Sequence, residues 1–131
     1  MSERTGAAEP GTAATNRELI EYIKGRYSEQ RCTDVQQLLS TMASPIRFRI
    51  LCALRTHSFT VAELVEITDS GLSNVSQQLK MMWMAGYISK ERRGKQVVYS
   101  LADKRVAQAI DVLESLYPRE RYPDGNGCAD E

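Results

Sequence analysis

The run S-N-V-S-Q-Q-L-K at 73–80 carries the side chains best suited to recognising another molecule through hydrogen bonds. Hydroxyls and carboxamides donate and accept hydrogen bonds, and Asn or Gln can grip adenine with two bonds in the DNA major groove. If this run is helical, the side opposite its apolar residues holds Ser73, Asn74 and Gln77. Gln78 and Lys80 flank that face, while Ser76 lies nearer the buried edge, where it would position other groups. The alternative is a surface helix kept polar for solubility.

Three basic residues follow, Arg92, Arg93 and Lys95, where apolar and polar residues begin to alternate. The alternation is typical of two antiparallel strands, and Gly94 lies between the basic residues, so they would crowd the tip of a hairpin. A narrow basic finger suits phosphates or a minor groove. Basic residues also protect strand edges from unwanted pairing, so the tip alone favours neither interpretation.

The chain has three cysteines, Cys32, Cys52 and Cys128. Their odd number and wide spacing do not fit a disulfide-built fold, and in a reducing compartment they begin as thiols. Cys52 follows Ile50 and Leu51, so it is either a small buried apolar group or a reactive thiol with a stabilised thiolate. Cys128 lies in an acidic tail, which makes a thiolate less favourable there.

No set of residues in the chain predicts an enzyme. The single histidine, His57, cannot build a Ser/His/Asp set, and neither a Gly-rich phosphate loop nor a carboxylate pair framed by apolar sequence occurs. We therefore expect no catalytic residues, no metal and no cofactor.

The elements that must position these residues begin with three helices. A T-x-x-E capping box opens a helix at 15 to about 31, and a T-x-x-Q signal opens a second at Thr33. Ser44 followed by Pro45, a capping residue before a proline at the first helical position, opens a third.

The next segment predicts a helix-turn-helix. Thr60 with Glu63 forms another capping box, and the short helix it opens must stop at the turn-prone residues 69–71. A second helix starts at once, near Ser70, and Gly86 is well placed to end it. Its apolar residues form one stripe, Leu72, Val75, Leu79, Met82 and Trp83.

The period then changes to that of strands and returns to that of a helix. Strands are expected at 87–92 and 96–101, with Val97, Tyr99 and Leu101 on one face, and a last helix at 103–117 ends before Pro118. The fold class is therefore mainly α (α+β), a winged helix-turn-helix with a two-stranded hairpin wing. Residues 15–117 would form this domain, between flexible tails at 1–14 and 118–131.

Composition supports a protein that binds nucleic acid in the cytoplasm. The chain of 131 residues is 42% apolar and 26% charged, as in globular proteins, and has neither a membrane-spanning run nor a secretion signal. Its formal net charge is zero, but residues 41–100 hold eight basic residues against four acidic ones. A polyanion would be drawn to this middle part, although ordinary solvated surfaces alone would account for an excess this small.

Four segments carry a resemblance to a known family: L-L-S-T-M-A-S-P-I-R-F-R-I-L-C-A-L at 38–54, S-N-V-S-Q-Q-L-K at 73–80, A-G-Y-I at 85–88 and G-K-Q-V-V-Y-S-L at 94–101. Over residues 38–117 the chain resembles the ArsR/SmtB family of winged-helix repressors. The resemblance implies a palindromic double-stranded DNA operator, a homodimer formed through the first and last helices, and an inducer that weakens binding. Two recognition helices would then meet half-sites about 34 Å apart.

The metal-sensing patterns of that family are missing from this chain. Thr60-Val61-Ala62 stands where a Cys-x-Cys would open the first helix of the helix-turn-helix, and the last helix contains no histidine. Both usual metal sites are therefore not expected. A non-standard site that combines the thiols with carboxylates remains an alternative.

Within the family the chain is most similar to the thiol-responsive BigR/HlyU type, through Ile50-Leu51-Cys52. In that type a second cysteine follows a Leu-Tyr at the end of the last helix, and oxidants or reactive sulfur join the two. Here Leu116-Tyr117 is followed by Pro118, so the partner thiol is missing from its usual place. Cys128 or Cys32 could replace it. A further alternative is a winged-helix dimerisation or docking module that does not bind DNA.

Overall fold

The computed structural model describes residues 11–122 of the chain. The chain divides into two compact units, Met1–Leu39 and Ser40–Glu131. Most of the two predicted tails, together with Cys128, lies outside the described residues. The domain boundaries at 15 and 117 therefore stay predictions.

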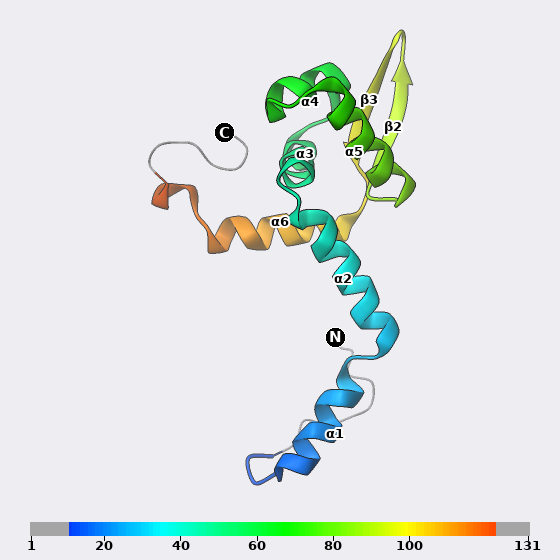
Figure 1. Cartoon of the computed structure of the whole chain (residues 1–131). Helices are drawn as coiled ribbons and strands as arrows, with labels where there is room; N and C mark the ends of the chain where they lie inside the picture. Colours follow the sequence, from blue (N-terminus) through cyan, green and yellow to red (C-terminus); the bar gives the residue numbers. More distant parts are fainter. Residues whose placement is uncertain (1–10, 123–131) are drawn as a thin grey trace. The chain divides into compact units, whose positions relative to one another are not determined.

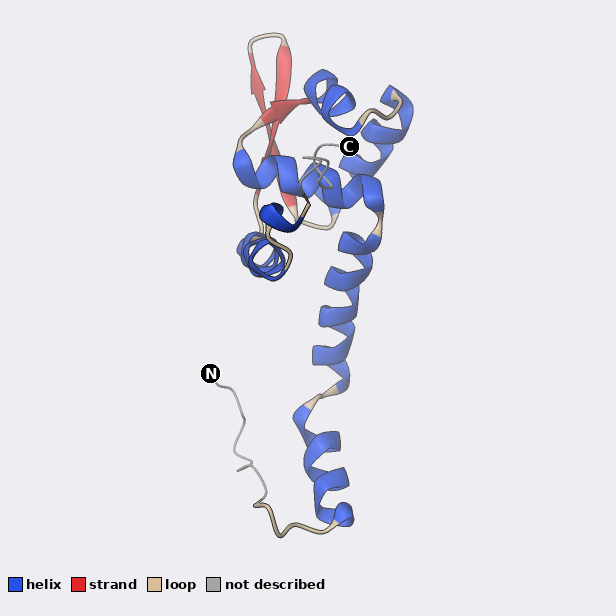
Figure 2. Cartoon of the chain, turned by 90° about the vertical axis from the view of Figure 1, so that its left-hand side faces the viewer, coloured by secondary structure: helices blue, strands red, loops and turns tan. Residues whose placement is uncertain are grey.

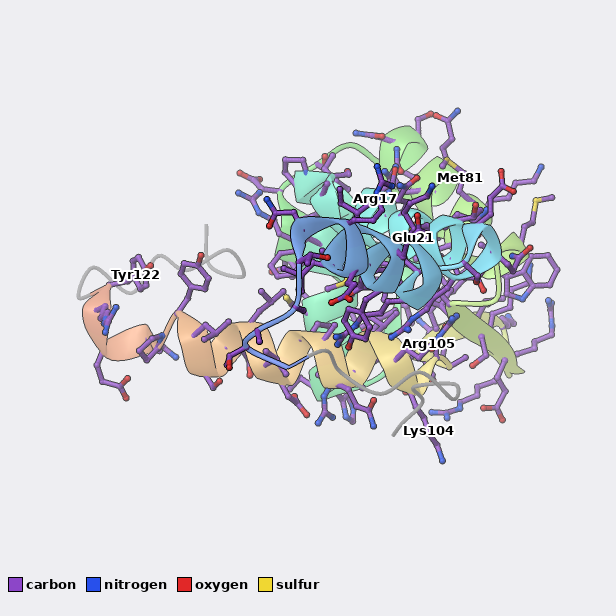
Figure 3. The ribbon with its side chains drawn as sticks, turned by 90° about the horizontal axis from the view of Figure 1, so that it is seen from below. Arg17, Glu21, Met81, Lys104, Arg105 and Tyr122 are labelled. Atoms are coloured by element: carbon purple, nitrogen blue, oxygen red, sulfur yellow. The ribbon has the colours of Figure 1, made fainter. Side chains whose placement is uncertain are left out.

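The first unit contains helix α1 (Asn16–Arg26) and the beginning of α2 (Glu29–Ala43). The predicted capping box is present, since Thr15 Oγ1 accepts from Glu18 N at 3.2 Å and Glu18 Oε1 accepts from Thr15 N at 3.1 Å. Arg17 and Glu21 pair along the helix at 3.3 Å (Figure 3). No residue of α1 or α2 is buried.

The predicted boundary between the first two helices is wrong. The first helix ends at Arg26 rather than near 31, and the second begins at Glu29. Ser28 supplies the cap five residues earlier than the expected Thr33, because its Oγ accepts from Arg31 N at 3.2 Å. Thr33 lies inside α2, where its hydroxyl donates to Glu29 O at 3.0 Å and is satisfied without capping anything.

The second unit combines helices with a small antiparallel sheet (Figures 1 and 2). Its helices after the last turn of α2 are α3 (Pro45–Thr56), α4 (Val61–Thr68), α5 (Leu72–Met84), α6 (Lys104–Leu116) and a 3-10 turn at Arg119–Arg121. Its strands are β1 (Phe59–Thr60), β2 (Ile88–Arg93) and β3 (Gln96–Leu101), in the order β1-β3-β2. The predicted caps of the third and fourth helices, Ser44 and Thr60, are present, and Asp103 is the N-cap of α6.

All the helices α3 to α6 contribute to one core. The largest side chains with essentially no exposed surface are Ile50, Leu51, Leu64, Leu79, Met82, Ile110, Val75 and Val106. Ile88 and Val98 are also buried, although the strand register places them on opposite faces of the sheet. The one buried polar residue among those described, Thr68, is satisfied because its hydroxyl donates to Leu64 O at 2.8 Å. This core fixes how α5 and the hairpin are presented.

Two details of this unit differ from the sequence predictions. Strand β1 was not expected, and its two residues pair with Tyr99 and Val98 of β3. The apolar stripe of α5 is narrower than predicted, because Leu72 and Trp83 are 61% and 43% exposed.

Within the described residues, no helix is both long and apolar enough to cross a membrane.

Candidate nucleic-acid interface

A three-residue turn at 69–71 connects α4 to α5. Asp69 adopts the left-handed conformation (φ 57°, ψ 38°), and its backbone N–H donates to Val65 O, which ends α4. Gly71 is the N-cap of α5 and provides no side-chain acceptor for the first turn. The predicted helix-turn-helix is therefore present, with the second helix starting at Leu72 rather than near Ser70.

The predicted reading residues all lie on the exposed side of α5. Val75, Leu79 and Met82 are buried and hold the helix against the core. Ser73, Asn74, Ser76, Gln77 and Lys80 are all exposed. We define Ser73, Asn74 and Gln77 as the reading face. Their contact with DNA stays a prediction.

Gln78 is engaged within the protein. Its Oε1 accepts from Arg47 Nη1 at 3.0 Å, and its Nε2 donates to Asn74 Oδ1 at 3.2 Å. Arg47, in the first turn of α3, was not expected at the site. The spacing of Arg47 in the sequence could have indicated its inward position. It precedes the buried Ile50 and Leu54 by three and seven residues, so the three lie on the same side of the helix.

The hairpin presents the three predicted basic residues. Strand β2 extends to Arg93, which pairs with Gln96, so the turn has two residues, Gly94 and Lys95. Gly94 has a φ of +63°, which glycine adopts without strain. Arg93 Nη2 pairs with Glu91 Oε1 at 3.2 Å. Arg92 and Lys95 are exposed and make no ion pair with any described residue.

A cation–π contact connects the end of α5 to the hairpin. Lys90 Nζ on β2 lies 4.1 Å from the centroid of the Trp83 ring. The ring is 43% exposed on its helix and is therefore partly covered by the lysine. This contact covers part of an exposed tryptophan at the C-terminal end of α5.

Two carboxylates of α6 are held ionised by neighbouring arginines. Asp103, the N-cap of α6, has a pKa lowered by its side-chain hydrogen bonds to Arg105, the closest being 2.6 Å. The pKa of Asp111 is lowered by two hydrogen bonds from Arg55 of α3, at 3.0 and 2.8 Å. The Arg55–Asp111 pair is exposed, whereas the Asp103 side chain is largely covered beside an exposed Arg105.

The candidate sensor residues are distributed over both units. Cys52 is half-buried on α3, and Cys32 is half-buried on α2 in the first unit. His57 packs edge-on against Phe59, with ring centroids 5.5 Å apart. Among residues 11–122, no three His, Cys, Asp or Glu side chains are grouped so as to hold a metal.

The geometry defines a winged helix-turn-helix class of protein, and comparisons with known proteins give the family. The model of the bacterial regulatory protein, arsR family, matches residues 44–90. The biofilm growth-associated repressor of Agrobacterium fabrum is 36% identical over 89 residues, which cover 68% of this chain and 76% of the relative.

Two solved structures are similar to the larger part of this chain. The transcriptional repressor BigR from Xylella fastidiosa has a TM-score of 0.64 and 28% identity, covering 79% of this chain and 97% of that one. HlyU from Vibrio cholerae has a TM-score of 0.64 and 29% identity, covering 69% and 98%.

The chain belongs to the ArsR family of bacterial transcriptional regulators. The predictions of the family, of the winged helix-turn-helix fold and of a non-enzymatic regulator are thereby confirmed. So is the likeness to BigR and HlyU within the family.

Proposed function

We propose that this repressor acts in the cytoplasm as a homodimer that binds a palindromic operator in double-stranded DNA. The observation that carries the proposal is the position of the reading face, which lies exposed on a helix whose opposite side is buried in the core. A helix of this kind fits the major groove, where amide and hydroxyl groups discriminate base pairs.

The groups around the reading face suit phosphates. Arg92 and Lys95 are exposed cations without acidic partners among the described residues. The first N–H groups of α5 lack a side-chain cap, because Gly71 is the N-cap, and such groups favour an anion. Phosphate contacts of both kinds would hold the protein in register while the reading face contacts bases.

The proposal of a homodimer rests on apolar side chains that one copy leaves exposed. On α1 and α2 they are Ile20, Ile23, Val35 and Leu39, and at the end of α6 they are Val112, Leu116 and Tyr117. Helix faces of this kind are stabilised by pairing with a second copy across a two-fold axis. We propose that residues 15–117 form the domain for both DNA binding and dimerisation.

A selection from duplexes with a random central sequence tests this function. We expect the wild-type protein to enrich a palindrome, and Asn74→Ala with Gln77→Ala to lose that enrichment while keeping weak, salt-sensitive binding. The matched control is Gln36→Ala, an exposed amide on α2, which should select the wild-type sequence. Wild-type protein that enriches no sequence would identify the chain as a docking module instead.

We further propose that the inducer acts on thiols. Cys52 is half-buried on α3, and BigR and HlyU are among the similar structures. An oxidant or polysulfide would take two electrons and two protons from Cys52 and from either Cys128 or Cys32, forming a disulfide that weakens operator binding. Mass spectrometry and binding assays on Cys→Ser variants test this step. Unchanged binding in every treated variant would exclude it, and metal titration of the reduced protein would then test a metal inducer.

A further inference from the structure

Three side chains from two helices form one continuous series of hydrogen bonds that ends at the reading face. Arg47 of α3 donates from Nη1 to Gln78 Oε1 at 3.0 Å, and Gln78 donates from Nε2 to Asn74 Oδ1 at 3.2 Å. We call these three residues the amide relay. Two of its members lie one turn apart on α5, and Asn74 belongs to the reading face.

The other end of the relay is anchored to backbone. Arg47 Nε donates to Thr41 O at 3.0 Å, and Nη2 donates to Ser40 O at 3.3 Å, both in the last turns of α2. All three nitrogens of the planar guanidinium thus donate hydrogen bonds, and Arg47 is half-buried. It cannot turn away from Gln78 without also losing the bonds to these carbonyls.

The chemistry of arginine gives the relay one direction. A guanidinium has five donors and no acceptor, whereas an amide has one end of each kind. Gln78 must therefore direct its oxygen to Arg47. This orientation directs the nitrogen of Gln78 to Asn74. Asn74 in turn directs its oxygen to Gln78, so its Nδ2 is left for an outside acceptor. Neither amide can flip without placing two donors or two acceptors together.

We propose that Arg47 is a positioning residue for sequence reading, and that it sets the direction of the Asn74 amide through Gln78. This inference rests on the proposed DNA-binding function. With Nδ2 directed outward and one Oδ1 lone pair still available, Asn74 presents the donor and acceptor that match N7 and N6 of adenine. Gln78 uses its oxygen and one N–H in hydrogen bonds within the protein, and so links Arg47 to Asn74.

Arg47→Gln tests the direction of the relay. An amide at position 47 can donate or accept, so the series can run either way and Asn74 loses its fixed orientation. The base pair concerned is the one whose preference disappears in Asn74→Ala, measured on duplexes selected by the wild-type protein. We expect Arg47→Gln to reduce the preference there by about tenfold, within the range of one bidentate contact. Arg47→Lys, which only donates, should restore most of it.

Arg49→Gln is the matched control. It removes the same charge from the same helix, but Arg49 Nη1 makes a hydrogen bond to Thr68 O at 3.5 Å and lies outside the relay. Its base preference should equal that of the wild type. If Arg47→Gln also keeps the full preference, the inference is overturned while DNA binding stands. If the wild-type protein selects no sequence, the proposed function itself fails.

Gln78→Glu tests the second link and does not require changing Arg47. A carboxylate still accepts from Arg47 but cannot donate, so Asn74 must turn its Nδ2 inward and its Oδ1 outward. We expect the preference at that base pair to move from adenine towards cytosine, whose N4 amino group is a donor. In the free protein the Asn74 side-chain amide protons should shift in the NMR spectrum. An unchanged Asn74 signal together with an unchanged base preference would contradict the proposal.

Discussion

The reading face and the hairpin tip are both exposed, but they are held in different ways and carry different chemistry. The reading face is uncharged, lies over the buried Val75, Leu79 and Met82, and is joined to Arg47 by hydrogen bonds. The tip carries long cations on a two-stranded ribbon whose outer residues are exposed. Fixed amides favour sequence discrimination, because hydrogen bonds to bases depend on direction. Exposed cations favour affinity for phosphates, because charge attraction depends little on direction.

The largest effect should come from removing the support of the reading face. Leu79→Ala deletes a side chain with no exposed surface, which should lower the free energy of unfolding by about 2–5 kcal/mol. Chemical denaturation measures the change. Met84→Ala, on an exposed residue of the same helix, should cost far less. Equal losses of stability in the two variants would mean that the buried side of α5 does not hold the helix against the core.

The hairpin variants should weaken binding without changing sequence preference. Arg92→Ala and Lys95→Ala each remove one cation without an acidic partner among the described residues. Each should lower the slope of log affinity against log salt by about 1, uniformly over duplex sequences. Binding titrations at several salt concentrations measure this slope. A change in base preference would show that the tip also reads sequence.

A smaller effect is expected where the end of α5 contacts strand β2. Lys90→Met keeps the alkyl chain over the Trp83 ring but removes the charge 4.1 Å from its centroid. The cation–π contribution at such an exposed site is about 0.5–1 kcal/mol, so the free energy of unfolding should fall by no more than this amount. Tryptophan fluorescence during unfolding reports both the loss and the local contact. A loss as large as that of Leu79→Ala would contradict the assignment.

The smallest effect concerns acid sensitivity and should leave both regions unchanged. Arg55 lowers the pKa of Asp111 in the folded protein, so the pair stabilises the fold at pH values above about 3.9, the usual pKa of an unfolded aspartate. As pH falls below that value the unfolded state takes up the proton first, and this stability is lost. Asp111→Asn should therefore show a shallower acid loss of stability in pH-dependent denaturation. An identical acid profile in the two proteins would exclude a contribution from this pair.

Local signals in the sequence predicted most of the fold. Ser44 and Thr60 are capping residues whose effect is decided within one helical turn, so the starts of their helices are predicted correctly. The signal at Thr33 was misleading, because Ser28 offered an earlier cap and the threonine hydroxyl was satisfied inside the helix. A local pattern cannot decide between two such caps.

Features that depend on distant residues were not predictable. Strand β1 has two residues, too few for a period, and exists because β3 pairs with it. The bond from Arg47 to Gln78 joins residues that are 31 positions apart. The sequence placed Gln78 beside the reading face, but its hydrogen-bond partners come from the way α3 packs against α5.

The most direct test of the account is an NMR titration of the protein with a duplex obtained by selection. The account predicts that, at high salt, binding of the duplex shifts the side-chain amide signals of Asn74 and Gln77 more than those of any other residue. The signals of Arg92 and Lys95 should revert towards their free positions under the same conditions. Amide signals of Asn74 and Gln77 that stay unchanged while the duplex is bound would contradict it.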